Sequence, residues 1–109
     1  MPSVPGTISG NINNFDGQWI VEGNPISLHG DLAQFPEKWD ANATLEYDDV
    51  EDLAGDLYII DEQSPSYIGP PDLRLSLAGE GGKTITIVGF LTSPISERIE
   101  VNGRASLLR

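Results

Sequence analysis

The chain has 109 residues and no cysteine, and its 17 acidic residues against 6 basic ones give a net charge of −11 at pH 7. A chain of this length fits one domain, because two halves would each be too small to bury a sizeable core. The absence of cysteine excludes disulfides, thiolate nucleophiles and cysteine-ligated metal sites. The acidic balance disfavours nucleic-acid binding, because phosphates would be repelled.

The sequence also lacks the signals of membrane insertion and of secretion. No stretch approaches the ~18 consecutive apolar residues that a membrane helix needs. Residues 1–6 carry neither the basic region nor the apolar run of a signal peptide. If the chain starts at its natural N-terminus, the sequence therefore predicts a soluble, cytoplasmic protein that does not bind membranes.

A hairpin and a further strand are predicted in the first third of the chain. Residues 7–12 and 18–22 are the predicted strands of the hairpin, and they flank residues 13–17, where Asn, Asp and Gly tolerate left-handed backbone. Residues 22–25 read Glu-Gly-Asn-Pro, which is a second turn signal. This turn leads into an alternating strand at residues 26–29.

The middle of the chain contains two predicted strands and the only helical signal. Residues 43–47 and 55–60 alternate between apolar and polar side chains, which is typical of strands with one buried face. Between them, residues 48–54 fit one short helical turn that Asp48 would cap. Residues 63–71 hold three prolines and one glycine, so we predict that they form the longest irregular loop.

The clearest hairpin signal lies further along the chain. Residues 73–77 have leucine at every second position, and residues 84–91 are rich in β-branched and aromatic side chains. The glycine-rich link at residues 78–83 allows the backbone conformations of a tight connection. We therefore predict an antiparallel hairpin here, with the leucines facing the core.

The C-terminal segment fits two topologies. Residues 98–107 alternate as one strand, with Ala105 and Leu107 on the same face. The pair Asn102 and Gly103 is also a strong two-residue hairpin signal, which would divide the segment into two shorter strands. We favour one long strand with a glycine bulge, because Gly103 falls in phase with the inward positions.

Together these elements predict a single all-β domain over residues 1–109. The recurring turn signals and the absence of alternating helices and strands indicate an antiparallel β-sandwich or a small β-barrel of about eight short strands. At most one helical turn is expected, near residues 48–54. The pattern does not distinguish the sandwich from the barrel, so both remain open.

The acidic residues are concentrated in the middle of the chain. Residues 37–62 carry ten of them and a single basic residue, Lys38. Carboxylates on a loop can chelate calcium, which takes about six to eight oxygen ligands, but their spacing here differs from that of an EF-hand loop. A basic partner protein is a second possible ligand of this surface, with Trp39 as an additional contact, and the simplest interpretation is a solvated surface. The candidate ligands for calcium or for a partner are Asp48, Asp49, Glu51, Asp52 and Asp56.

The aromatic residues suggest an alternative ligand. Trp19 lies among apolar neighbours and is predicted to be in the core, whereas Trp39 has polar neighbours and is predicted to be exposed. Aromatic rings exposed on a sheet can stack against sugar rings while Asp and Asn bind the hydroxyl groups. The further candidates for such a contact are Tyr47, Tyr58 and Tyr67.

The sequence contains little that supports catalysis. His29 is the only histidine, and a serine or cysteine triad would have to be built around it without a supporting motif. We therefore predict a non-catalytic binding domain that engages another protein through the acidic patch at residues 46–62 or through a strand edge. The alternatives are a small-ligand or glycan-binding domain and a calcium-binding module, and no other cofactor is expected. No sequence feature indicates a particular oligomeric state.

Overall fold

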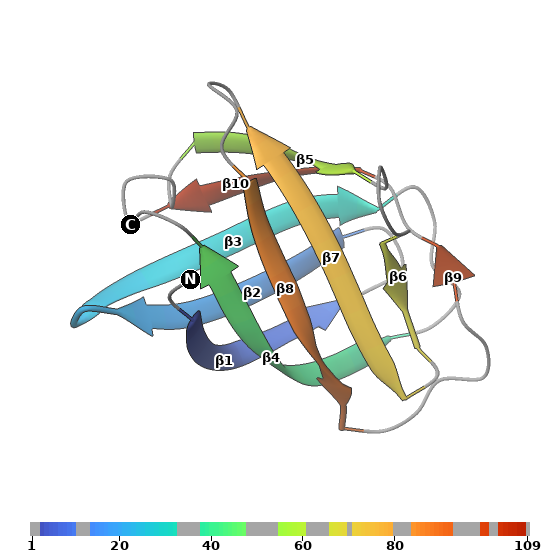
Figure 1. The fold of residues 1–109 in the computed structure, drawn as a ribbon. Coiled ribbons are helices and arrows are strands. Elements are labelled where there is room, and N and C mark those ends of the chain that lie inside the picture. Colours follow the sequence, from blue (N-terminus) through green and yellow to red (C-terminus); the bar gives the residue numbers. More distant parts are fainter. Residues whose placement is uncertain are drawn as a thin grey trace.

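The computed structural model describes residues 3–10, 14–32, 38–47, 55–60, 66–69, 71–79, 84–92, 99–100 and 103–108. Across these residues it contains ten β-strands, shown in Figure 1, and no helix. Accordingly, the described part of the chain has no helix long and apolar enough to cross a membrane. The strands are β1 (Ser3–Gly10), β2 (Asn14–Val21), β3 (Asn24–Leu32), β4 (Trp39–Tyr47), β5 (Gly55–Ile60), β6 (Tyr67–Ile68), β7 (Asp72–Gly79), β8 (Thr84–Leu91), β9 (Ile99–Glu100) and β10 (Gly103–Leu108).

Eight of these strands close into an antiparallel barrel. Their order is β5-β10-β3-β2-β1-β4-β8-β7, and β7 pairs back to β5. The short strand β6 pairs with the start of β7, and β9 pairs with β6. The all-β prediction is confirmed, and the pairing of β5 with both β10 and β7 decides between the two architectures in favour of the barrel.

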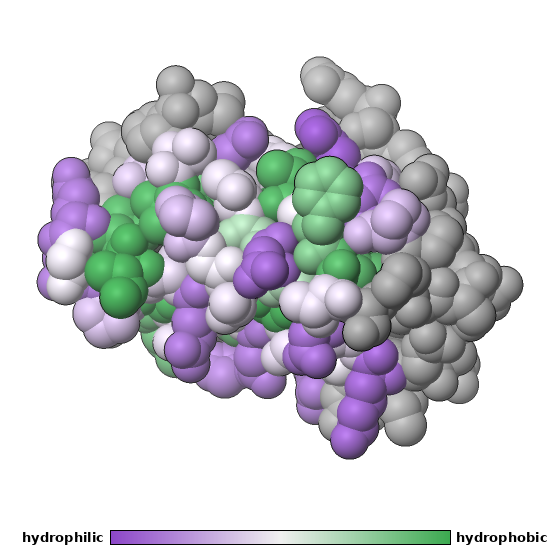
Figure 2. All heavy atoms as spheres, turned by 90° about the horizontal axis from the view of Figure 1, so that it is seen from below, coloured by the Kyte–Doolittle hydropathy of each residue, from purple (hydrophilic) through white to green (hydrophobic). Residues whose placement is uncertain are grey.

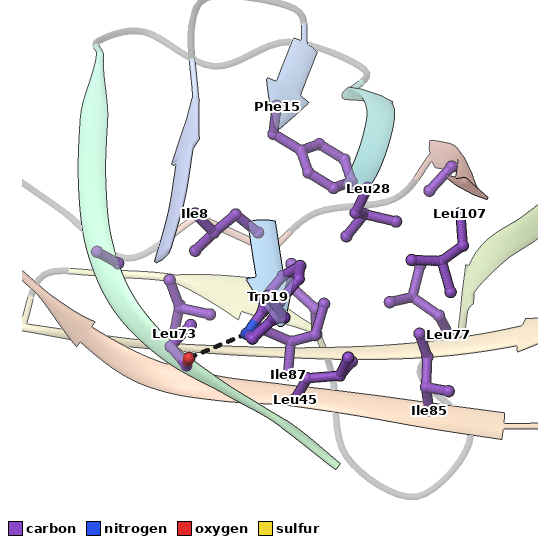
Figure 3. Close-up of a cluster of buried hydrophobic side chains, with 14 of the residues drawn as sticks. Ile8, Phe15, Trp19, Leu28, Leu45, Leu73, Leu77, Ile85, Ile87 and Leu107 are labelled. Carbon is purple, nitrogen blue, oxygen red and sulfur yellow. Dashed lines mark hydrogen bonds between the residues drawn. The ribbon is translucent and has the colours of Figure 1, made fainter. Parts of the chain in front are cut away.

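The barrel interior is filled by the hydrophobic core. Trp19 is 2% exposed and lies among aliphatic side chains in Figure 3, as the sequence predicted. Its indole Nε1 donates a hydrogen bond to the carbonyl oxygen of Ala43 on β4, at 3.1 Å. An eight-stranded barrel is just wide enough for side chains to fill its interior. The described inward-facing side chains occupy this interior, and the grooves considered below lie on the outer surface.

Glycines make room for the largest rings inside the barrel. Each ring lies directly across from a glycine on the neighbouring strand, where an added Cβ would overlap the ring. Such pairs stabilise a curved sheet, because the ring covers the backbone that the glycine leaves bare. The pairs are Trp19 with Gly6, Trp39 with Gly10 and Phe15 with Gly30.

The burial of Trp39 corrects a prediction. Its side chain is only 3% exposed, so the exposed contact expected from its polar neighbours is wrong. Trp39 begins β4 and starts an inward series that continues through Ala41 and Ala43. Because alanine is a weak hydrophobic signal, the sequence pattern concealed the first half of this strand.

The predicted hairpins are present, with one boundary shifted. Strands β7 and β8 pair with their predicted faces buried. Strands β2 and β3 are joined by a turn in which Glu22 and Gly23 have φ angles of 52° and 81°. Residues 14–17, predicted as a turn, belong to β2 instead. The reason is that Phe15 and Gly17 continue the inward alternation of that strand.

Two predictions for the second half of the chain are also corrected. Residues 63–71 are not wholly irregular, because β6 lies within them and pairs with β7 and β9. In place of one long C-terminal strand there are two, β9 and β10, and they have different partners: β9 pairs with β6, whereas β10 pairs with β3 and β5. The predicted helical turn at residues 48–54 lies outside the described residues.

Candidate functional site

A groove of about 850 Å³ crosses the outer face of β2, β3, β10 and β5. We call it the β10 groove, because β10 runs through its middle. Successive side chains of a strand point to opposite faces, so the outward side chains of these four strands line it while their neighbours fill the core. The outward lining residues are Asn14, Asp16, His29, Asp31, Asp56, Tyr58, Arg104 and Ser106.

The strand register arranges these side chains in two rows. Directly opposite residues on neighbouring strands have Cβ atoms about 4.5–5.5 Å apart, so members of a row are close neighbours. One row runs Asp16, His29, Ser106, Asp56, and the other runs Asn14, Asp31, Arg104, Tyr58. The groove therefore brings together segments that are distant in the sequence.

An ion pair orients the only histidine of the chain. The Nδ1 atom of His29 contacts Oδ1 of Asp16, and the two side chains are 62% and 56% exposed. Exposed pairs of this kind are screened by water and contribute at most about 1 kcal/mol. The contact therefore adds little to the stability of the fold. Its main effect is that the Asp16 carboxylate is already engaged by His29.

The row of Asp16, His29 and Ser106 has the residue order of a serine-hydrolase triad. Such a triad also needs a hydrogen bond from the serine hydroxyl to the imidazole, and donors that stabilise an oxyanion. Within the described residues, no hydrogen bond joins Ser106 to His29, although the register makes them neighbours. The row therefore lacks the hydrogen bond from serine to histidine on which a triad assignment would rest.

The predicted acidic site is described only in part. Asp56 lies in the β10 groove and is exposed, so it is available to a ligand. The other predicted carboxylates lie outside the described residues: Asp48, Asp49, Glu51 and Asp52. Trp39, the remaining predicted contact, is in the core.

Calcium binding by residues 48–56 stays a prediction that can be tested directly. We expect millimolar calcium to leave the melting temperature unchanged relative to a matched ionic strength. The reason is that the spacing of the carboxylates differs from that of an EF-hand loop. A calcium-dependent rise in the melting temperature that EDTA reverses would contradict this expectation, because a ligand that binds only the folded state must stabilise it.

Of the other groove residues, sequence reasoning identified Tyr58 as a candidate contact and considered His29, but it missed the rest. Tyr58 is 53% exposed, whereas Tyr47 is buried and Tyr67 is half-buried, with its hydroxyl donating to Asp72 at 2.7 Å. Alternation in β2, β3 and β10 could have identified Asp31 and Arg104 as outward-facing. It could not have shown that both lie near Tyr58, because that depends on the order of strands in the barrel.

Comparison with models of known protein families gives no match, and comparison with curated protein sequences gives none either. The functional argument therefore depends on the groove residues themselves.

Proposed function

We propose that this protein is a non-catalytic binding domain that docks a basic segment of a partner protein in the β10 groove. The observation that carries this proposal is the exposure of Tyr58 in the same groove as the carboxylates of Asp31 and Asp56. An exposed tyrosine ring attracts a lysine or arginine side chain through its π-electrons, and a nearby carboxylate adds to that attraction.

The position of the basic side chain follows from the two rows. Arg104 lies between Asp31 and Tyr58 in register, so a cation placed over the middle of that row would be repelled. Asp56 and Tyr58 are two residues apart on the outer face of β5, away from the centre of the groove. A lysine or arginine that lies across Tyr58 with its charge near Asp56 makes both contacts and places that charge beside Ser106, the neighbour of Asp56, rather than beside Arg104.

The charge of the surrounding chain supports a basic partner. Four acidic residues precede Asp56 by four to eight positions in the sequence, and the chain as a whole carries a net charge of −11. The negative electrostatic field of these carboxylates accelerates and orients the approach of a positively charged partner. It also predicts that binding weakens as salt concentration rises.

Closure of the barrel disfavours the strand-edge route. Each of the eight barrel strands has a neighbour on both sides, so their backbone groups are already paired. Of the described strands, β9 ends the pairing order, and it has only two residues. A partner is therefore expected to contact side chains of the groove rather than to extend the sheet.

The test uses a short synthetic peptide of alternating lysine and threonine, titrated by calorimetry at low salt and at about 0.15 M salt. We expect binding at low salt that Asp56→Asn and Tyr58→Ala each weaken about fivefold, which corresponds to ~1 kcal/mol. Tyr58→Phe should bind like the unmodified protein, because it keeps the ring.

The matched control is Glu22→Gln, which removes one exposed carboxylate from the β2–β3 turn, outside the groove. This change should leave peptide affinity almost unaltered. If Glu22→Gln and Asp56→Asn weakened binding equally, attraction would come from net charge alone and the proposed site would be wrong. Absence of binding at low salt would also refute the proposal.

A further inference from the structure

A second groove, of about 390 Å³, lies over the outer face of β4, β8 and β7. Phe90 on β8 lines it and is 71% exposed, which is the highest value among the exposed large hydrophobic side chains of the described chain. Phe90 is the next-to-last residue of β8, whose arrowhead reaches the lower end of the barrel in Figure 1. We call this site the Phe90 groove.

Polar side chains surround the ring of Phe90. Its directly opposite neighbours are Asn42 on β4 and Asp72 on β7. The next row along the strands contributes Thr44 and Arg74 on either side of Val88. The underside of the barrel in Figure 2 likewise has separate hydrophobic areas with polar side chains between them. A lone apolar residue on a surface needs no explanation, but an aromatic ring within a polar groove has the composition of a binding site.

The charges of this groove nearly balance. Asp72 accepts a hydrogen bond of 2.7 Å from the Tyr67 hydroxyl, and the guanidinium of Arg74 lies one row away on the same strand face. Among the lining residues that the structure describes, one carboxylate and one guanidinium leave no strong net charge, unlike the β10 groove. The groove is therefore suited to a neutral ligand.

The site is also held in a fixed shape by the strands beneath it. A Cβ on Gly89, beside Phe90, would overlap the Asn42 carbonyl oxygen and lie 2.7 Å from Cα of Ala43. The missing side chain thus lets β8 approach β4 closely under the groove. Sites built on rigid strands lose little entropy on binding, which favours ligands that make few contacts.

We propose that the Phe90 groove binds a neutral saccharide, with one sugar ring stacked on Phe90. A pyranose ring presents a face of C–H groups to an aromatic ring and a rim of hydroxyl groups around it. Asn42, Thr44 and Arg74 line the groove beside Phe90 and carry donors and acceptors for such hydroxyl groups. A wholly apolar ligand would leave these groups unpaired, and the balance of Asp72 and Arg74 gives a basic peptide no net attraction.

The full chain is titrated with cellotriose, maltotriose and triacetylchitotriose. Binding is measured by calorimetry and by saturation-transfer NMR. We expect at least one of them to bind, with an affinity that Phe90→Ala lowers about tenfold. Phe90→Tyr should retain binding, whereas Phe90→Leu should lose it, because leucine keeps apolar area without a ring face. Since Phe90 is exposed, all three variants should melt like the unmodified protein, and this is checked first.

The control variant is Tyr58→Ala, which alters the β10 groove and should leave saccharide binding unchanged. Failure of the peptide experiment and failure of this one are therefore distinguishable. No binding by any of the three saccharides, or binding that Phe90→Ala does not weaken, overturns the proposal. A loss of self-association on Phe90→Ala, measured by sedimentation velocity, would overturn it by showing that a second copy covers the ring.

Discussion

Replacing Trp19 with alanine is expected to lower the free energy of unfolding by about 4 kcal/mol, the largest effect that we predict for one substitution. The indole is 2% exposed, and its removal leaves a cavity in the middle of the barrel. The glycines that face the ring, Gly6 and Gly17, have no side chains with which to fill that space. The carbonyl of Ala43 also loses the hydrogen bond from Nε1.

Two further variants separate the causes of this loss, measured by urea denaturation. Trp19→Phe keeps much of the ring volume and loses the hydrogen-bond donor, so we expect a cost of about 2 kcal/mol. Ile20→Ala changes the next residue, which is 68% exposed, and should cost less than about 1 kcal/mol. Equal costs for Trp19→Ala and Ile20→Ala would contradict the assignment of inner and outer faces in β2.

Adding one methyl group at Gly89 is expected to cost about 3 kcal/mol. The new Cβ would overlap the carbonyl oxygen of Asn42 and lie 2.7 Å from Cα of Ala43, both on β4. These are backbone atoms, so they cannot turn away as a flexible side chain could. Relief requires β4 and β8 to separate, which would weaken the ladder that joins them between Ala41 and Tyr47.

The matched comparison for Gly89→Ala is Gly23→Ala in the β2–β3 turn. Gly23 has a φ angle of 81°, and a Cβ there would meet nothing within 4 Å. Replacing Gly23 with alanine therefore costs only the free energy of placing a side chain in the left-handed conformation, about 1 kcal/mol. We expect Gly89→Ala to be clearly the less stable of the two in urea denaturation. The reverse order would mean that β8 and β4 do not approach as closely as described.

The two proposed sites share no lining residue and carry different charge. The β10 groove combines three carboxylates with one guanidinium, whereas the Phe90 groove has one of each. The side chains tested in the β10 groove lie on β5, whereas Phe90 lies on β8. Strand β7 contributes only Gly79 to the β10 groove and residues 72–74, at its other end, to the Phe90 groove, so a substitution of Tyr58 or Phe90 should leave the other groove intact. The use of Tyr58→Ala as the control for saccharide binding depends on this separation.

Local patterning determined much of the strand content of this protein. The alternating leucines of residues 73–77 identified both β7 and its buried face, because a residue's side of a strand follows from its position alone. The apolar neighbours of Trp19 likewise identified a core residue. The same reasoning failed at Trp39, where two alanines made the inward series too weak to recognise.

Tertiary structure alone decided how these strands are combined. The pairing of Leu57 with Gly79 closes the barrel, yet nothing in either segment specifies the other as its neighbour. The β10 groove depends on two such pairings, which bring Asp31 and Tyr58 to either side of Arg104. The sequence by itself determined which side chains face outward, because alternation is a local property of the backbone. Which outward side chains meet depends on pairing between distant segments, and that is set by packing of the whole core.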